Sequence, residues 1–101
     1  MQHKKIDSEK LVERTLVNEV RANGGLCIIL LSQHFIGLPD RICLFPGGVI
    51  AFVELKTTGA KPRKIQTFVH DKIRSLGFRV EVIDSVQGAI DLAMDLSKLP
   101  F

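Results

Sequence analysis

The sequence contains no tryptophan and no tyrosine, and six phenylalanines are its main aromatic side chains. Because Trp and Tyr are common platforms for stacked bases, this composition argues against recognition of single strands by stacking. Cysteine is scarce as well. Cys27 and Cys43 both lie in apolar runs and are too few for a disulfide scaffold or a zinc site. We therefore predict that both are reduced thiols of the core.

Long hydrophobic runs are also missing. No apolar stretch reaches the roughly 18 residues of a membrane helix, and the polar start "MQHKKIDSEK" is not a signal peptide. With 46% hydrophobic and 25% charged residues the composition is that of an ordinary soluble protein, and we expect one cytoplasmic domain spanning residues 1–101. The net charge of +3 permits an anionic partner such as nucleic acid but does not identify one.

Hydrophobic periodicity predicts a helix, a strand and a hairpin in the first half of the chain. The helix runs from about Ser8 to Asn23, with Asp7 or Ser8 as its cap and Gly24-Gly25 behind it. The apolar stretch Leu26–Ser32 predicts a buried strand. Two further apolar runs, "DRICLF" (40–45) and "VIAFVELK" (49–56), are joined by Pro46-Gly47-Gly48 and predict a β-hairpin.

The second half of the chain predicts a helix, a strand and a final helix. The first of these helices starts near Pro62 and stops at Gly77. Its predicted apolar face consists of Ile65, Phe68, Val69, Ile73 and Leu76. A strand at Arg79–Ile83 and a helix from Ser85 complete the order α-β-β-β-α-β-α. This order predicts an α/β fold in which helices flank a mixed β-sheet.

The stretch "FVELK" (52–56) places two charged residues at the end of an apolar strand. Because side chains alternate along a strand, Glu54 and Lys56 point to one face. If Pro46-Gly47-Gly48 is a three-residue loop, Asp40 lies directly across from Glu54. A loop one residue different would move Asp40 opposite Leu55 instead. In the favoured register, two carboxylates and a lysine converge on one patch.

Two facing carboxylates repel each other unless a cation lies between them. Hard oxygen ligands suit Mg²⁺ or Mn²⁺, and a neighbouring lysine can orient a water or neutralise a developing phosphate charge. Asp40, Glu54 and Lys56 therefore predict metal-assisted phosphodiester hydrolysis. Glu13 borders the core stripe of the first helix and is a further candidate acid, while Gln66 could hydrogen-bond the metal's water or the substrate.

Each of these features has an ordinary structural explanation when taken alone. A Glu-x-Lys at a strand end is usually an exposed salt bridge, Pro39-Asp40 a turn, and Glu13 a surface charge. We expect His70 to be a surface residue. The joint occurrence of the charged residues around one hairpin is what favours a functional site.

The same residues are similar to a known family. "GLPDR" (37–41), "FPGG" (45–48), "FVELK" (52–56) and Gln66 resemble the VRR-NUC branch of the PD-(D/E)XK nucleases, and the likeness covers essentially the whole chain. Many members carry a lysine in the first strand and a Ser-Pro-Gly loop, where this chain has "IILLSQH" (28–34).

The resemblance implies a restriction-endonuclease-like fold and Mg²⁺- or Mn²⁺-dependent cleavage of DNA. It implies that Asp40 and Glu54 bind the metal, that Lys56 is catalytic, and that Glu13 and Gln66 support them. The backbone carbonyl of Leu55 is assigned as a further metal ligand. Small stand-alone members come from phages and bacteria, and the resemblance therefore implies that this chain acts in a bacterial or phage-infected cell. Such members are also expected to form homodimers.

A basic segment follows the predicted metal site. Lys61, Arg63 and Lys64 stand at the start of a helix, whose N-terminus favours anions, and we expect them to contact DNA phosphates. Further cations could extend this surface, namely Lys4, Lys5, Arg41, Arg74 and Arg79.

Two classes of function remain open from the sequence. The first is a structure-selective DNA endonuclease, with Holliday junctions, flaps and plain duplex as candidate substrates. The alternative is a catalytically idle DNA-binding or assembly module of a repair or restriction complex. Metal binding discriminates between them.

Overall fold

The computed structural model describes residues 5–31 and 33–99. Lys4, and Ser32 at the end of the first predicted strand, lie outside these described residues. Within them the chain forms three helices and four strands in the predicted order. The elements are α1 (Glu9–Ala22), β1 (Leu26–Ile29), β2 (Arg41–Phe45), β3 (Val49–Leu55), α2 (Lys64–Ser75), β4 (Arg79–Ile83) and α3 (Val86–Ser97). No helix of the described chain is both long and apolar enough to span a membrane.

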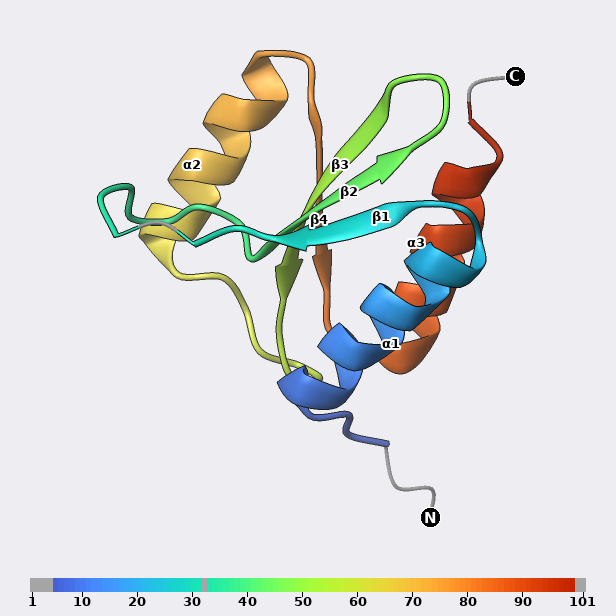
Figure 1. Cartoon of the computed structure of the whole chain (residues 1–101). Coiled ribbons are helices and arrows are strands. Elements are labelled where there is room, and N and C mark those ends of the chain that lie inside the picture. Colours follow the sequence, from blue (N-terminus) through green and yellow to red (C-terminus); the bar gives the residue numbers. More distant parts are fainter. Residues whose placement is uncertain (1–4, 32, 100–101) are drawn as a thin grey trace.

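The strands form a mixed sheet in the order β1-β2-β3-β4 (Figure 1). Strand β2 pairs antiparallel with both β1 and β3, and β4 runs parallel to β3. Glycines suit the turn between β2 and β3, because Gly47 and Gly48 both have positive φ angles. The turn pairs Phe45 with Val49 and Arg41 with Val53, so the three-residue loop and its register are confirmed.

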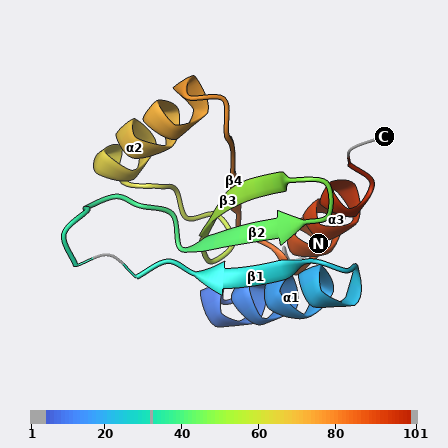
Figure 2. The same cartoon turned by 45° about the horizontal axis from the view of Figure 1, so that its top comes forward.

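The main core lies between one face of the sheet and the pair α1 and α3, which pack against each other; Figure 2 shows α1 below β1 and α3 to the right of the strands. Helix α1 buries a stripe at four-residue intervals, Val12, Leu16 and Val20. Ser8 caps its N-terminus, and the side-chain oxygen of Ser8 accepts a hydrogen bond from the backbone N–H of Leu11. Alternate residues of β2 and β3 face these helices: Cys43, Phe45, Ala51, Val53 and Leu55.

Cys27 and Cys43 are both free thiols, as predicted, and they are paired across β1 and β2. Their sulfur atoms are 3.9 Å apart. Cys43 is buried in the main core, whereas Cys27 is only half-buried at the edge of it.

The buried strand predicted at 26–32 is shorter and more exposed than expected. Strand β1 ends at Ile29, and Leu26, Ile28 and Ile29 are exposed. The physical reason is its position at the edge of the sheet, where only Cys27 packs against the core. Apolar composition alone does not distinguish an edge strand from a central one.

Helix α2 lies on the opposite side of the sheet from α1 and α3 (Figure 2). Its predicted apolar face is only partly confirmed: Val69 is buried and Ile73 is half-buried, but Phe68 is 71% exposed, and Ile65 and Leu76 are exposed as well. The residues that α2 buries are Gln66, Val69 and His70. The helix is therefore turned so that two polar side chains, Gln66 and His70, face the sheet. Burying these side chains is favourable only if they meet a polar partner on the sheet.

Candidate functional site

The polar partner on the sheet is Glu54, on the face of β3 turned towards α2. The β2–β3 register that pairs Arg41 with Val53 places Asp40, one residue earlier, opposite Glu54. Asp40 is held on both sides of β2. Its Oδ2 accepts a hydrogen bond of 2.8 Å from the Leu55 backbone N–H, and its own carbonyl accepts one of 2.8 Å from the Leu30 N–H. The predicted approach of Asp40 to the end of β3 is thus present.

Glu54 is a buried carboxylate, with only 2% of its surface exposed. Its Oε2 accepts a hydrogen bond of 3.0 Å from Gln66 Nε2 and lies 3.7 Å from Lys56 Nζ. Its Oε1 lies 3.3 Å from His70 Nε2. Glu54 is therefore fixed by polar contacts to both of its oxygens, as a buried charged group requires.

Gln66 links the groups of this site to one another. Its Oε1 accepts hydrogen bonds from Lys56 Nζ at 3.1 Å and from the Arg63 backbone N–H at 2.8 Å. With the oxygen occupied by two donors, the amide nitrogen must face Glu54. The first turn of α2 thereby orients the strand residues Glu54 and Lys56 relative to each other.

The electrostatics of the site are dominated by the burial of Glu54. Burial raises the pKa of Glu54 to about 7, the negative charge of Asp40 adds to the rise, and the Lys56 ammonium opposes it. Glu9, at the start of α1, raises the same pKa further. The two carboxylates repel each other, so a cation placed between them would lower the free energy of the site.

His70 is a member of the site that the sequence did not reveal. It was expected at the surface but is 1% exposed, and it contacts Glu54. Burial lowers the pKa of His70, and the nearby Arg74 guanidinium lowers it further. A neutral ring with its proton on Nε2 donates to an ionised Glu54. The available signal was the four-residue spacing of Gln66 and His70, which places both on one face of α2.

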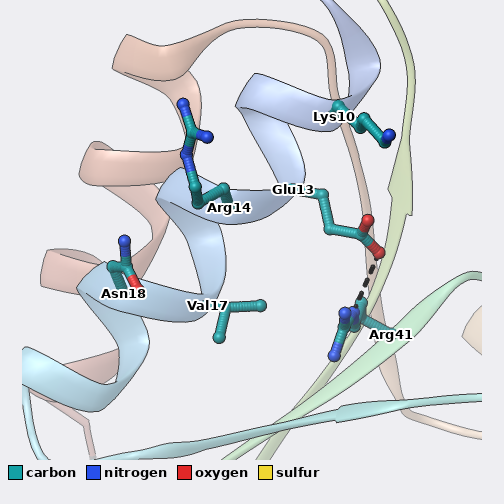
Figure 3. Close-up of a pocket in the computed structure, with 6 residues that line it drawn as sticks. All are labelled: Lys10, Glu13, Arg14, Val17, Asn18 and Arg41. Atoms are coloured by element: carbon teal, nitrogen blue, oxygen red, sulfur yellow. Dashed lines mark hydrogen bonds and ion pairs between the residues drawn. The ribbon is translucent and has the colours of Figure 1, made fainter.

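Glu13 is not brought to this cluster. Its carboxylate forms an ion pair of 3.1 Å with Arg41, which points to the α1 side of the sheet (Figure 3). Glu9, one turn earlier on α1, raises the pKa of Glu54 through its negative charge. The role of Glu13 in metal binding stays a prediction.

The residues predicted to contact DNA fall into two groups. Lys61, Arg63 and Lys64 are exposed and lie in the loop and first residue that open α2, next to Gln66. Arg41 is only 17% exposed and lies on the other face of the sheet, paired with Glu13. The basic segment therefore adjoins the Glu54 cluster, whereas Arg41 belongs to a separate surface.

The donor atoms suit a hard divalent cation. Asp40 and Glu54 supply carboxylate oxygens, which are the protein ligands that Mg²⁺ and Mn²⁺ accept together with waters and phosphate oxygens. Among residues 5–31 and 33–99, no group of three or more His, Cys, Asp or Glu side chains is arranged to hold a metal. The residues therefore fit a metal ion that has two protein carboxylates as ligands and takes its remaining ligands from water and substrate.

Comparisons with known proteins agree with the geometry. A phage protein named "Putative nuclease p44", from Acyrthosiphon pisum secondary endosymbiont phage 1, is 42% identical over 77 residues, which is 76% of this chain and 83% of that protein. A solved structure described as a VRR_NUC domain superposes with a TM-score of 0.75 and 28% identity, over 94% of this chain and all of that one. No family model matches the sequence.

Proposed function

The chain belongs to the VRR-NUC family of nuclease domains, and from this premise we propose that it is a divalent-metal-dependent, structure-selective DNA endonuclease. The observation that carries the proposal is the buried Glu54, whose pKa is raised by burial and by Asp40, with Lys56 beside it. A buried carboxylate with a raised pKa beside a second acid and a lysine is typical of a catalytic site. DNA in a bacterial or phage-infected cell is the proposed substrate.

The proposed roles follow from the contacts of each side chain. Asp40 and Glu54 would hold Mg²⁺ or Mn²⁺, with the Leu55 carbonyl as a further proposed ligand. A bound ion of this kind polarises the scissile phosphate and lowers the pKa of a water. Lys56, which donates a hydrogen bond to Gln66, would align the attacking water or neutralise charge on the phosphate. Gln66 and His70 hold Glu54 in position.

The basic segment at the start of α2 supports DNA as the substrate. Lys61, Arg63 and Lys64 lie where the helix dipole is positive, so these cations do not stabilise the helix. Phosphate groups would be favoured there by both the side chains and the helix N-terminus. The segment is joined to the cluster through the Arg63 N–H, which donates to Gln66.

A homodimer would supply two sites for the two strands of a branched DNA. The exposed apolar edge of the sheet supports this proposal. Strand β1 has one unpaired side, and Leu26, Ile28 and Ile29 are exposed on it without the lysine or proline that usually protects an edge. Sedimentation of the protein alone would measure its oligomeric state.

Incubation with a panel of four-way junction, flap and duplex DNAs, with and without Mn²⁺, tests the proposed activity. We expect Mn²⁺-dependent cleavage that favours a branched substrate and that is lost in Glu54→Ala. Glu81→Ala is the matched control, because it removes a carboxylate from the neighbouring strand β4, where Glu81 pairs with Arg79. Wild-type cleavage by Glu54→Ala, or no cleavage by the wild type, would overturn the assignment.

A second candidate is a binding module without catalysis. It is favoured by the missing three-acid group in the described residues and by the full set of hydrogen bonds on Glu54. In that case calorimetry would detect no Mn²⁺ binding by the wild type, although the protein would still bind DNA.

A further inference from the structure

A cavity of about 440 Å³ lies between α1 and the start of β2, outside the Glu54 cluster (Figure 3). It is lined by Lys10, Glu13, Arg14, Val17, Asn18 and Arg41. We call this surface the α1 groove. Of these residues, Arg41 is the one predicted from the sequence to contact DNA, and it faces away from the Glu54 cluster, towards Glu13.

The groove carries an excess of positive charge. Three cations and one carboxylate line it, and the carboxylate of Glu13 is already engaged by the Arg41 guanidinium at 3.1 Å. Lys10 and Arg14 are exposed, and the ion pair leaves their charges uncompensated by Glu13. Like charges gathered at one concave surface raise the local potential, which an anionic ligand lowers.

The spacing of the α1 residues makes an extended anion site. Lys10, Arg14 and Asn18 follow one another at intervals of four and therefore form one row along the helix. The row spans about 12 Å at roughly 1.5 Å per residue. Lysine and arginine donate to phosphate oxygens, and the Asn18 amide adds a neutral donor of the kind that contacts DNA backbones. This length accommodates more than one phosphate of a strand.

The groove and the proposed catalytic cluster meet along the chain at the start of β2, where Arg41 directly follows Asp40. Arg41 points to the α1 side of the sheet, where it pairs with Glu13. The Lys61–Lys64 segment opens α2 on the opposite side. A DNA backbone that passes around the start of β2 would therefore lead from the cluster to the groove.

We propose that the α1 groove binds the phosphate backbone of DNA beside the cleavage site, through Lys10 and Arg14, with Arg41 held in place by Glu13. This inference rests on the proposed nuclease function for its choice of ligand. Its contacts are to the backbone, so it contributes affinity without reading sequence.

The test is equilibrium binding of a fluorescently labelled duplex in EDTA, over a series of salt concentrations. The variant is Lys10→Gln/Arg14→Gln, which keeps long side chains with good helix propensity. Loss of two phosphate contacts should reduce the slope of log K against log salt by about 1.8 and weaken binding about 30-fold at 0.15 M salt. Circular dichroism confirms that the variant is folded.

Lys72→Gln/Lys98→Gln is the matched control, because it removes the same charge from exposed positions outside the groove. The control should keep the wild-type slope. An unchanged slope in the Lys10/Arg14 variant, an equal loss in the control, or no duplex binding by the wild type would overturn the inference. If the slope falls as expected but the wild type cuts no DNA with Mn²⁺, the result supports DNA binding by the α1 groove and contradicts the proposed nuclease function.

Discussion

Replacement of Glu54 by glutamine should make the metal-free protein more stable at alkaline pH. The pKa of Glu54 rises from 4.5 to about 7 on folding, chiefly through burial. At about 1.4 kcal/mol for each unit of pKa, ionised Glu54 costs the folded state about 3 kcal/mol relative to the unfolded chain. The side chain is 2% exposed, so solvent does little to reduce this cost.

The sign of the pH dependence follows from proton binding. Between pH 4.5 and pH 7 the folded state keeps a proton on Glu54 that the unfolded chain has released. The free energy of unfolding contributed by this group therefore falls as the pH rises through that window. The glutamine side chain of the variant cannot ionise, so the variant escapes this loss. The neutral His70 ring can exchange tautomers and accept a hydrogen bond from the new amide, which makes the variant compatible with the site.

Urea unfolding in EDTA, followed by far-ultraviolet circular dichroism because the chain has no tryptophan, measures the effect. The stability of Glu54→Gln relative to wild type should increase by about 3 kcal/mol between about pH 4.5 and about pH 8.5. Mn²⁺ at about pH 8.5 should then stabilise the wild type but not the variant. An equal difference at both pH values would refute the account of Glu54 as a carboxylate whose ionisation is opposed by burial.

Further predictions concern the groups around Glu54. Lys56→Ala should abolish Mn²⁺-dependent cleavage in a gel assay, while its DNA affinity in EDTA, measured by fluorescence anisotropy, stays within about threefold of wild type. Cleavage at the wild-type rate would exclude Lys56 from catalysis. His70→Leu should weaken Mn²⁺ binding by calorimetry at least about 10-fold, and His70→Gln should recover most of it, since glutamine keeps a donor for Glu54; equal affinities in both variants would show that His70 only fills space. Glu9→Gln should weaken Mn²⁺ binding more than Glu13→Gln, because the charge of Glu9 acts on Glu54, whereas Glu13 is paired with Arg41 on the α1 side of the sheet; the reverse order would make Glu13 the metal-supporting acid of α1.

The hairpin was predictable because its signals are local. Pro46-Gly47-Gly48 sets the loop length, and the strict alternation of side chains then fixes which residues of β2 and β3 face each other. Asp40, Glu54 and Lys56 were placed together by that reasoning alone. The element order was equally accessible, since each helix and strand carries its own periodicity and terminal residues.

The errors arise where neighbouring elements decide the outcome. Strand β1 is apolar enough for the interior, but its place at the sheet edge leaves Ile28 and Ile29 exposed. Helix α2 has a more hydrophobic face than the one it buries, because Glu54 on the sheet selects Gln66 and His70 as its partners. Periodicity counts apolar residues and contains no information about a buried carboxylate on another element.

The first-helix acid shows the same limit at the level of one turn. Glu13 was predicted as the supporting acid because it borders the core stripe of α1, and Glu9, one turn earlier, was not considered. The structure gives Glu13 a partner in Arg41, on the α1 side of the sheet. Which side of the sheet Arg41 occupies depends on the β2 register, so the assignment of α1 residues required the whole sheet rather than the helix alone.

The central claim is that Asp40 and Glu54 form a metal-dependent site for DNA cleavage. The most direct measurement is the single-turnover cleavage rate of a branched DNA as a function of Mn²⁺ concentration, for wild type and for Asp40→Asn. The account predicts a rate that rises and saturates with Mn²⁺ for the wild type and no measurable rate for the variant. Cleavage by Asp40→Asn with the wild-type Mn²⁺ dependence, or no cleavage by the wild type at any Mn²⁺ concentration, would contradict it.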